Sequence, residues 1–167
     1  MTFDPSRPDL AVAVIGAGAM GRGIAQVAAQ GGMRVKLLDS RPGTAAEARG
    51  YIEKMLGQQV EKGRMAAEDA AAAVGRLAVA DGTGDLADSD LVVEAIVEAL
   101  EPKQALFAEL EGIVRADCIL ASNTSSLVVA AIGVKCKRPE RVAGFHFFNP
   151  VPLMKLEIGR ASCRERV

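Results

Sequence analysis

The chain has 167 residues, half of them hydrophobic and a quarter charged, and a formal net charge of −1 at pH 7. Its length is typical of one domain, which buries about 70% of the surface that the unfolded chain exposes. Basic and acidic residues are interspersed, which argues against nucleic acid and a membrane surface as partners. The first residues lack the apolar stretch of a signal peptide, and the three cysteines lack metal-ligand spacing. We therefore expect a cytoplasmic protein with reduced thiols and no metal site.

Apolar runs alternate with stretches of helical periodicity along the whole chain. The predicted strands are residues 11–16, 33–39, 76–80, 89–96, 118–123 and 141–148. The predicted helices are residues 19–30, 44–62, 65–77, 101–114 and 125–132. This alternation predicts an α/β fold, a doubly wound and mostly parallel sheet covered on both faces. We expect an N-terminal tail at 1–9 and a single domain over 10–156.

The segment Gly16-Ala17-Gly18-Ala19-Met20-Gly21 fits the pattern G-x-G-x-x-G between a strand and a helix. In that context the glycines allow a tight turn, close approach of the backbone to a pyrophosphate, and close packing of helix on strand. The N-terminus of the helix would attract the diphosphate, while the Met20 side chain is expected to pack. The alternative is a glycine turn that binds nothing.

Asp39 closes the next predicted strand. Its carboxylate can accept hydrogen bonds from both ribose hydroxyls and would repel a 2′-phosphate. We therefore predict NAD as the cofactor, although Arg41 nearby leaves a role for NADP open.

His146 is the only histidine of the chain and stands among phenylalanines in "GFHFFNP". It could be a core residue. However, it lies at the end of the last predicted strand, and the carboxyl ends of such strands line the ligand crevice in open α/β sheets. Oxidation of a secondary alcohol needs a base for the hydroxyl proton, and imidazole titrates in the right range.

Several polar residues nearby have ordinary structural explanations as well as functional ones. Ser125 precedes a predicted helix and could cap it, and Asn149 could open the turn at the proline that follows. Glu98 and Lys103 could be a carboxylate at a helix end and a solvated lysine. Lys62 could likewise be a solvated surface residue.

Four segments carry a more specific signal: "GAGAMGRGIAQ", "VVEAIVEALEPKQALF", "ASNTSSL" and "GFHFFNPVPLMKLE". Together, over about residues 10–157, they resemble the cofactor-binding half of bacterial L-3-hydroxyacyl-CoA dehydrogenases. The resemblance implies an NAD-dependent enzyme that oxidises (S)-3-hydroxyacyl-CoA to 3-oxoacyl-CoA in fatty-acid or related acyl-CoA breakdown.

The resemblance also implies roles for individual residues. His146 would be the catalytic base, and Ser125 would hydrogen-bond the substrate oxygen next to the nicotinamide. The remaining positions would be nucleotide contacts (Glu98, Lys103, Asn149) and a contact to the CoA moiety (Lys62).

The pattern breaks near the C-terminus. The family has a glutamate twelve residues after the histidine that orients it, whereas Glu157 follows His146 by eleven. Because side chains of an extended segment alternate between two faces, a shift of one residue reverses the direction of the carboxylate, so we do not assign Glu157 this role. The segment 157–167 lacks periodicity and resembles an in-frame reading of a sequencing adapter. We expect a non-native tail there, the alternative being a genuine short tail.

The family's second, helical domain supplies its dimer interface, part of the acyl-CoA site and a catalytic asparagine. We therefore expect a homodimeric parent protein with an acyl-CoA substrate, and a fragment that binds NAD but turns over hydroxyacyl-CoA poorly. Two alternatives stay open: a sugar-acid dehydrogenase of the same fold, and a non-catalytic NAD(H)-binding module.

Overall fold

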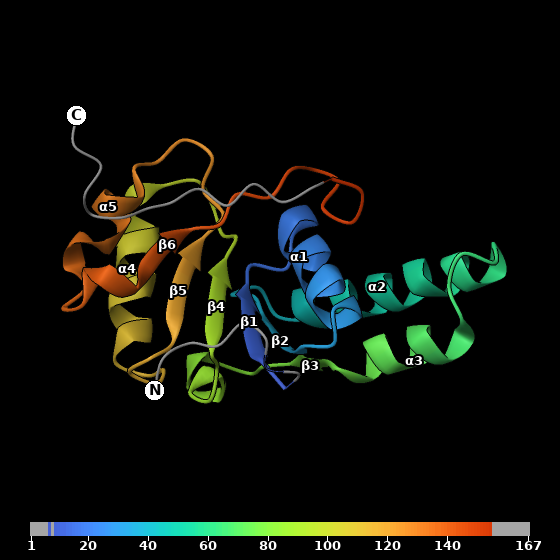
Figure 1. Cartoon of the computed structure of the whole chain (residues 1–167). Coiled ribbons are helices and arrows are strands. Elements are labelled where there is room, and N and C mark those ends of the chain that lie inside the picture. The colour runs from blue at the N-terminus through green and yellow to red at the C-terminus, as the bar shows by residue number, and fades with distance from the viewer. Residues whose placement is uncertain (1–6, 8, 155–167) are drawn as a thin grey trace.

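Six parallel strands form one sheet in the order β3-β2-β1-β4-β5-β6 (Figure 1). The computed structural model describes residue 7 and residues 9–154. The strands are β1 Ala11–Ile15, β2 Arg34–Leu38, β3 Leu77–Val79, β4 Leu91–Glu94, β5 Ile119–Ser122 and β6 Val142–Gly144. The predicted fold class is confirmed. The strand order reverses between β1 and β4, where sheets of this kind bind ligands at their carboxyl ends.

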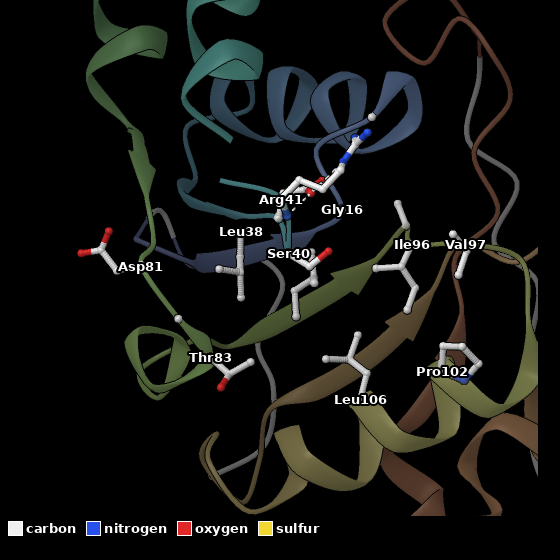
Figure 2. A pocket seen from close by; sticks show the side chains of 15 residues that line it. Gly16, Leu38, Ser40, Arg41, Asp81, Thr83, Ile96, Val97, Pro102 and Leu106 are labelled. Carbon is white, nitrogen blue, oxygen red and sulfur yellow. Dashed lines mark hydrogen bonds and ion pairs between the residues drawn. The ribbon is translucent and has the colours of Figure 1, made fainter. Parts of the chain in front are cut away.

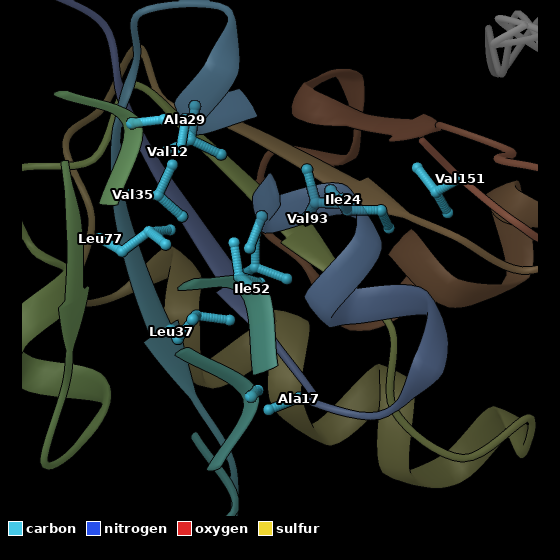
Figure 3. Close-up of a cluster of buried hydrophobic side chains, with 14 of the residues drawn as sticks. Val12, Ala17, Ile24, Ala29, Val35, Leu37, Ile52, Leu77, Val93 and Val151 are labelled. Carbon is cyan, nitrogen blue, oxygen red and sulfur yellow. The ribbon is translucent and has the colours of Figure 1, made fainter. Parts of the chain in front are cut away.

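Helices cover both faces of the sheet. They are α1 Ala19–Gln30, α2 Thr44–Glu61, α3 Ala67–Gly75, α4 Leu100–Glu111 and α5 Val129–Ile132, with short 3₁₀ turns η1 Thr83–Leu86, η2 Gly133–Lys135 and η3 Pro139–Arg141. Alternate residues of the central strand point to opposite layers: Val12 and Val14 pack with α1–α3 (Figure 3), and Ala13 and Ile15 pack with α4 and α5. A strand buried on both faces reads as the continuous apolar run seen in the sequence.

Helix α1, predicted over residues 19–30, ends at Gln30 and is followed by the glycine pair Gly31-Gly32. Gly32 has φ of +93°, which glycine adopts without strain. The N–H groups of Gly32 and Met33 donate to the carbonyls of Ala29 and Ala28, the bonding pattern of a Schellman motif. This sharp stop allows β2 to start directly beside β1.

Helices α2 and α3, predicted at residues 44–62 and 65–77, run side by side away from the sheet (Figure 1). Ile52 and Leu56 of α2 are fully buried against the sheet layer. Lys62 follows the last residue of α2 and lies exposed at the far end of this arm.

The predicted bounds differ from the observed ones by up to three residues for most elements and by more at two places. The last strand was expected to reach residue 148 but ends at Gly144, because its neighbour β5 ends at Ser122, which pairs with Gly144. The helix expected from residue 125 starts at Val129, with Val128 as N-cap and no side-chain capping bond. Ser125 is therefore not a helix cap. None of the three 3₁₀ turns was predicted.

Arg7, the last residue but two of the expected N-terminal tail, forms ion pairs with Asp9 and with the buried Asp90 at the start of β4. Cys118 and Cys136 are free, buried thiols. In the part of the chain that the structure describes, no helix is long and apolar enough to cross a membrane. The segment 157–167, with Glu157 and Cys163, lies outside the described residues.

Candidate dinucleotide site

The glycine loop (Gly16–Gly21) joins β1 to α1, and its three motif glycines differ in what surrounds them. Gly16 has φ of +93°, and a Cβ on it would lie 2.5 Å from the Ala95 carbonyl oxygen. A Cβ on Gly21 would lie 1.6 Å from the Gly16 carbonyl oxygen. At Gly18, by contrast, a Cβ would meet no heavy atom within 4 Å. Two glycines thus close the turn, and the third leaves open space over the backbone.

Helix α1 begins at this open space. Its N-cap is Gly18, and within the described chain no side chain caps it and its first turn holds no acidic residue. The first N–H groups of a helix have no partners inside the helix, and together with the helix dipole they form an anion site. The backbone of the glycine loop is therefore free to receive a phosphate group.

Asp39 stands beside the loop at the end of β2. Its carboxylate accepts hydrogen bonds from the N–H groups of Ala17 at 2.8 Å and Arg41 at 2.9 Å. Burial alone would raise the pKa of Asp39, but these two N–H donors and the Arg41 guanidinium outweigh it and lower the pKa below the usual value. Asp39 is therefore an anion fixed in place at the mouth of the site.

A cavity of about 830 Å³ opens between the glycine loop and the start of α4. Gly16, Gly18 and Asp39 form one side of it. Figure 2 shows apolar side chains around the same space, among them Leu38, Ile96 and Leu106. This combination of N–H donors, one carboxylate and apolar walls fits an adenosine diphosphate group.

Glu98, after β4, is bound to the loop that follows β5. Its Oε1 accepts hydrogen bonds from the Thr124 and Ser126 hydroxyls and from the N–H groups of Ser125 and Ser126. Burial would raise the pKa of Glu98, but the hydrogen bonds from Thr124, Lys103 and the loop amides outweigh it and lower that pKa to about 2. The Ser125 backbone is held in this way, while its side chain is exposed.

Lys103 is not the solvated lysine of the simpler interpretation. Its side chain is 1% exposed, and its Nζ lies 2.6 Å from Glu94 Oε1 and 3.2 Å from Glu98 Oε2. Glu94, at the end of β4, is itself fully buried and also accepts a hydrogen bond from the Ser122 hydroxyl. The structure thus joins Glu98, Lys103 and the Ser125 loop in one charged network.

His146 lies just beyond β6, half-buried, with its ring 4.8 Å from that of Phe148. The residues on either side hold it beside the end of β5: the Phe145 N–H donates to the Ser122 carbonyl, and the Phe147 N–H donates to Asn123 Oδ1. The imidazole is therefore placed at the carboxyl edge of the sheet, as the sequence predicts.

A second cavity, of about 210 Å³, lies on the other side of α1 and includes Asn149 in its lining. Arg22 of α1 stacks over the Tyr51 ring of α2 at 3.9 Å, and both residues line this cavity. Gln59 also lines it, and Lys62 follows three residues later on the arm, so the structure does not bring Lys62 to the first cavity.

Two residues of the site escaped the sequence prediction. A Cβ on Gly23 would lie 2.8 Å from Val151 Cβ, so this glycine lets the segment with Asn149 pack on α1. Gly23 could have been predicted from the sequence, because it follows the last glycine of the loop motif by two residues. Glu94 was taken for part of an apolar strand. The sequence feature that points to Glu94 is Lys103, which shares a helical face with Phe107 and Leu110 and is therefore expected to be buried. A buried lysine needs a carboxylate partner nearby.

The comparison with protein families decides the assignment. Residues 11–162 match the family model of the NAD-binding domain of 3-hydroxyacyl-CoA dehydrogenase. The chain belongs to this family. NAD is thereby its cofactor, in agreement with the sequence prediction.

Curated relatives and solved structures agree with this family. Over 144 residues, 86% of this chain, it is 49% identical to a "Probable 3-hydroxybutyryl-CoA dehydrogenase" of Deinococcus radiodurans, of which it covers 51%. It is 46% identical over 145 residues, 87% of this chain, to the 3-hydroxyadipyl-CoA dehydrogenase of Escherichia coli K12, of which it covers 30%. The crystal structure of 3-hydroxybutyryl-CoA dehydrogenase from Escherichia coli K12 superposes with a TM-score of 0.87 at 44% identity, covering 89% of this chain and 32% of that one. The chain thus spans about half or less of the length of these relatives.

The two glycines at the start of α1 make a matched pair for mutation. Gly21→Ala should unfold or strongly destabilise the domain, because no shift of a side chain relieves a contact of 1.6 Å with a backbone oxygen. Gly18→Ala should leave the melting temperature within a few degrees but weaken NADH binding by about tenfold or more, because its methyl group projects where the diphosphate would lie. Thermal melts and a fluorescence titration with NADH measure both effects, and equal melting temperatures for the two variants would contradict the packing role of Gly21.

Glu98 should make the stability of the domain sensitive to acid. Its pKa in the folded chain, about 2, lies below the 4.5 of a free glutamate, so its contribution is complete above pH 4.5 and is lost as the pH falls toward 2. Between these limits the free energy of unfolding of the wild type should fall more steeply than that of Glu98→Gln, as urea titrations at several pH values would show. Thr124→Val, which removes one donor, should shift the loss to higher pH; parallel curves for wild type and Glu98→Gln would refute the assignment.

Proposed function

We propose that this chain is the cofactor-binding half of an NAD-dependent enzyme that oxidises a (S)-3-hydroxyacyl-CoA to the 3-oxoacyl-CoA. The observation that carries the proposal is the glycine loop with its open helix N-terminus, which lies beside Asp39 at the reversal point of the sheet. When bound, NAD would supply the acceptor for the hydride that leaves the hydroxyl-bearing carbon.

The residues of the first cavity are suited to hold the adenosine half of the cofactor. The N–H groups at the start of α1 would bind the diphosphate, and the Asp39 carboxylate would accept hydrogen bonds from the ribose hydroxyls. Because Asp39 stays ionised, a 2′-phosphate at the same place would be repelled. Glu98 and Asn149 would contact the nicotinamide half, on the sides where their loops flank the carboxyl ends of the strands.

His146 would take the proton of the substrate hydroxyl group. The residue is half-buried, and the backbone hydrogen bonds of Phe145 and Phe147 hold it beside the end of β5. The exposed Ser125 hydroxyl would hydrogen-bond the same substrate oxygen. As the proton moves to imidazole and the hydride leaves the carbon, the alcohol becomes a ketone.

The second cavity supports an extended substrate. It adjoins the opposite side of α1 from the first cavity and runs toward the α2–α3 arm, where Lys62 could meet the phosphates of a CoA group. The relatives named for hydroxybutyryl-CoA and hydroxyadipyl-CoA favour a thioester over a sugar acid. A homodimeric parent and a place in fatty-acid or related acyl-CoA breakdown belong to the same proposal.

Cofactor choice tests the role of Asp39. The chain should bind NADH more tightly than NADPH, and Asp39→Ala should weaken NADH binding and bring the two affinities within about threefold of each other, because the repulsion of the 2′-phosphate is gone. Calorimetric titration of both nucleotides measures this. If Asp39→Ala bound NADH like the wild type, the carboxylate would not be at the ribose.

The chemical role of His146 is testable in a protein that carries this domain together with its second half. His146→Ala should lower kcat by about 10²–10⁴-fold, the usual contribution of a positioned acid–base group, while NADH affinity stays unchanged. Phe148→Ala serves as the control for loss of ring packing, since Phe148 contacts the imidazole but cannot accept or donate a proton. Unchanged turnover of 3-hydroxybutyryl-CoA in His146→Ala would remove the base from the proposal, and failure of acetoacetyl-CoA to bind would favour a non-catalytic NADH-binding module.

A further inference from the structure

We propose that Glu94 is a positioning residue of the site, which acts through Lys103 and Glu98 on the loop that carries Ser125. This inference rests on the proposed function, in which Ser125 contacts the substrate. It adds a residue with no contact to cofactor or substrate, and it places Lys103 behind the nucleotide site.

Glu94 is a fully buried carboxylate with every oxygen occupied. Its Oε1 accepts from Lys103 Nζ at 2.6 Å and from the Ile96 N–H at 2.7 Å, and its Oε2 accepts from the Ser122 hydroxyl at 2.7 Å. These donors come from the helix after β4, the turn at the end of β4 and the last residue of β5. The carboxylate therefore ties together the carboxyl ends of two neighbouring strands.

A buried ion pair is by itself weak evidence for a stabilising role. Removing two charges from water is costly, and replacing a buried pair by apolar side chains is often neutral or stabilising. At the layer where Lys103 lies, Phe107 and Leu110 complete the same buried face of α4 with apolar side chains. The pair between Glu94 and Lys103 is thus better explained by the effect of the Lys103 charge on a neighbouring group.

The neighbour of the pair is Glu98. Lys103 Nζ lies 3.2 Å from Glu98 Oε2, while Glu98 Oε1 receives the hydrogen bonds of Thr124, Ser125 and Ser126. One ammonium group therefore lies between a buried carboxylate and a carboxylate at the surface, which is 37% exposed. The position of the ammonium fixes one oxygen of Glu98, and the other oxygen fixes the loop.

The burial of Lys103 supports a role in which it transmits the effect of Glu94 to Glu98. Its side chain is 1% exposed, and the contacts of its ammonium group are to two carboxylates of the protein. Loss of the Glu94 charge should let the ammonium move toward Glu98. That movement would draw the Glu98 carboxylate away from the Ser125 and Ser126 amides and loosen the loop.

A double-mutant cycle on the 167-residue chain tests the relay. Glu94→Gln keeps the size of the side chain and removes its charge. It should weaken NADH binding by about tenfold in the wild-type background, because Glu98, which the relay positions, is proposed to contact the nicotinamide half of the cofactor. In the Lys103→Met background the same substitution should change NADH affinity by less than about twofold, because the group that transmits its effect is gone. Equal effects in both backgrounds, or no effect in either, would overturn the proposal.

Two further measurements separate positioning from folding and from cofactor binding. Ser122→Ala removes one neutral hydrogen bond from Glu94 and leaves all charges, so its effect on NADH affinity should be much smaller than that of Glu94→Gln; an equal effect would assign the loss to strand-end packing. Amide exchange at Ser125 and Ser126 in the cofactor-free chain should accelerate by about tenfold in Glu94→Gln, and unchanged exchange would refute the relay.

The exchange measurement also distinguishes the two proposals. If the wild-type chain failed to bind NADH, the proposed function would fail, while faster exchange in Glu94→Gln but not in the Lys103→Met background would still support the relay. Glu94→Gln leaves the Lys103 charge without its buried partner and could prevent folding. The double variant Glu94→Gln/Lys103→Met removes that charge as well. It should show the same exchange rates and NADH affinity as Lys103→Met. A double variant that differed from Lys103→Met in either would count against the relay.

Discussion

The close approach of Gly21 to the carbonyl group of Gly16 determines where the rest of the site lies. It brings the first turn of α1 over the end of β1, so that the N–H groups of the helix face the reversal point of the sheet. Two residues later along the same helix, Gly23 permits a second close approach, to Val151. One helix with two missing side chains thus positions the glycine loop on one side and the segment bearing Asn149 on the other. The glycine loop lines the first cavity, and residues of α1 line the second together with Asn149.

Helix α4 does the equivalent work on the other face of the sheet. Phe107 and Leu110 bury its apolar side in the second core layer, and the period of the helix then places Lys103 one turn nearer to the carboxyl edge. The packing of Phe107 and Leu110 thus sets the position of the Lys103 ammonium group, which forms ion pairs with Glu94 and Glu98. Core packing and the charged network are consequently parts of one arrangement, in which hydrophobic burial sets a position and ion pairing uses it.

The sequence predicted what depends on local pattern. Apolar runs between helical stretches located all six strands, and the glycine loop and Asp39, predicted as one site, do lie in contact at the carboxyl end of the sheet. Errors arose where a partner far along the chain decides the outcome. The aromatic run after β6 has the composition of a strand, yet the strand ends at Gly144 because β5 offers no further partner.

The serine loop and Glu94 show the same limit. Ser125 and Ser126 are residues that often cap helices. However, Glu98, which lies between β4 and α4, accepts hydrogen bonds from their N–H groups, and the helix begins only at Val129. Nothing within a few residues of Glu94 reveals that Lys103 and Ser122 satisfy it. The contact with Ser122 becomes predictable only when the strand order is known, since β4 and β5 are neighbours in the sheet.

The distribution of charge explains how a site for an anionic cofactor can contain three carboxylates. Asp39, Glu94 and Glu98 all lie at the carboxyl edge of the sheet, and bare anions there would repel a diphosphate. Each of them, however, is already engaged: Asp39 by two backbone N–H groups, Glu94 by Lys103 and two further donors, and Glu98 by the serine loop and the same lysine. Their charges are thereby partly compensated by protein donors, whereas the N-terminus of α1 has no side-chain cap and no acidic residue in its first turn. The arrangement therefore uses negative charge to hold loops in place and leaves the positive end of the helix dipole uncompensated by any carboxylate, which is why three carboxylates and a helix N-terminus can share one edge.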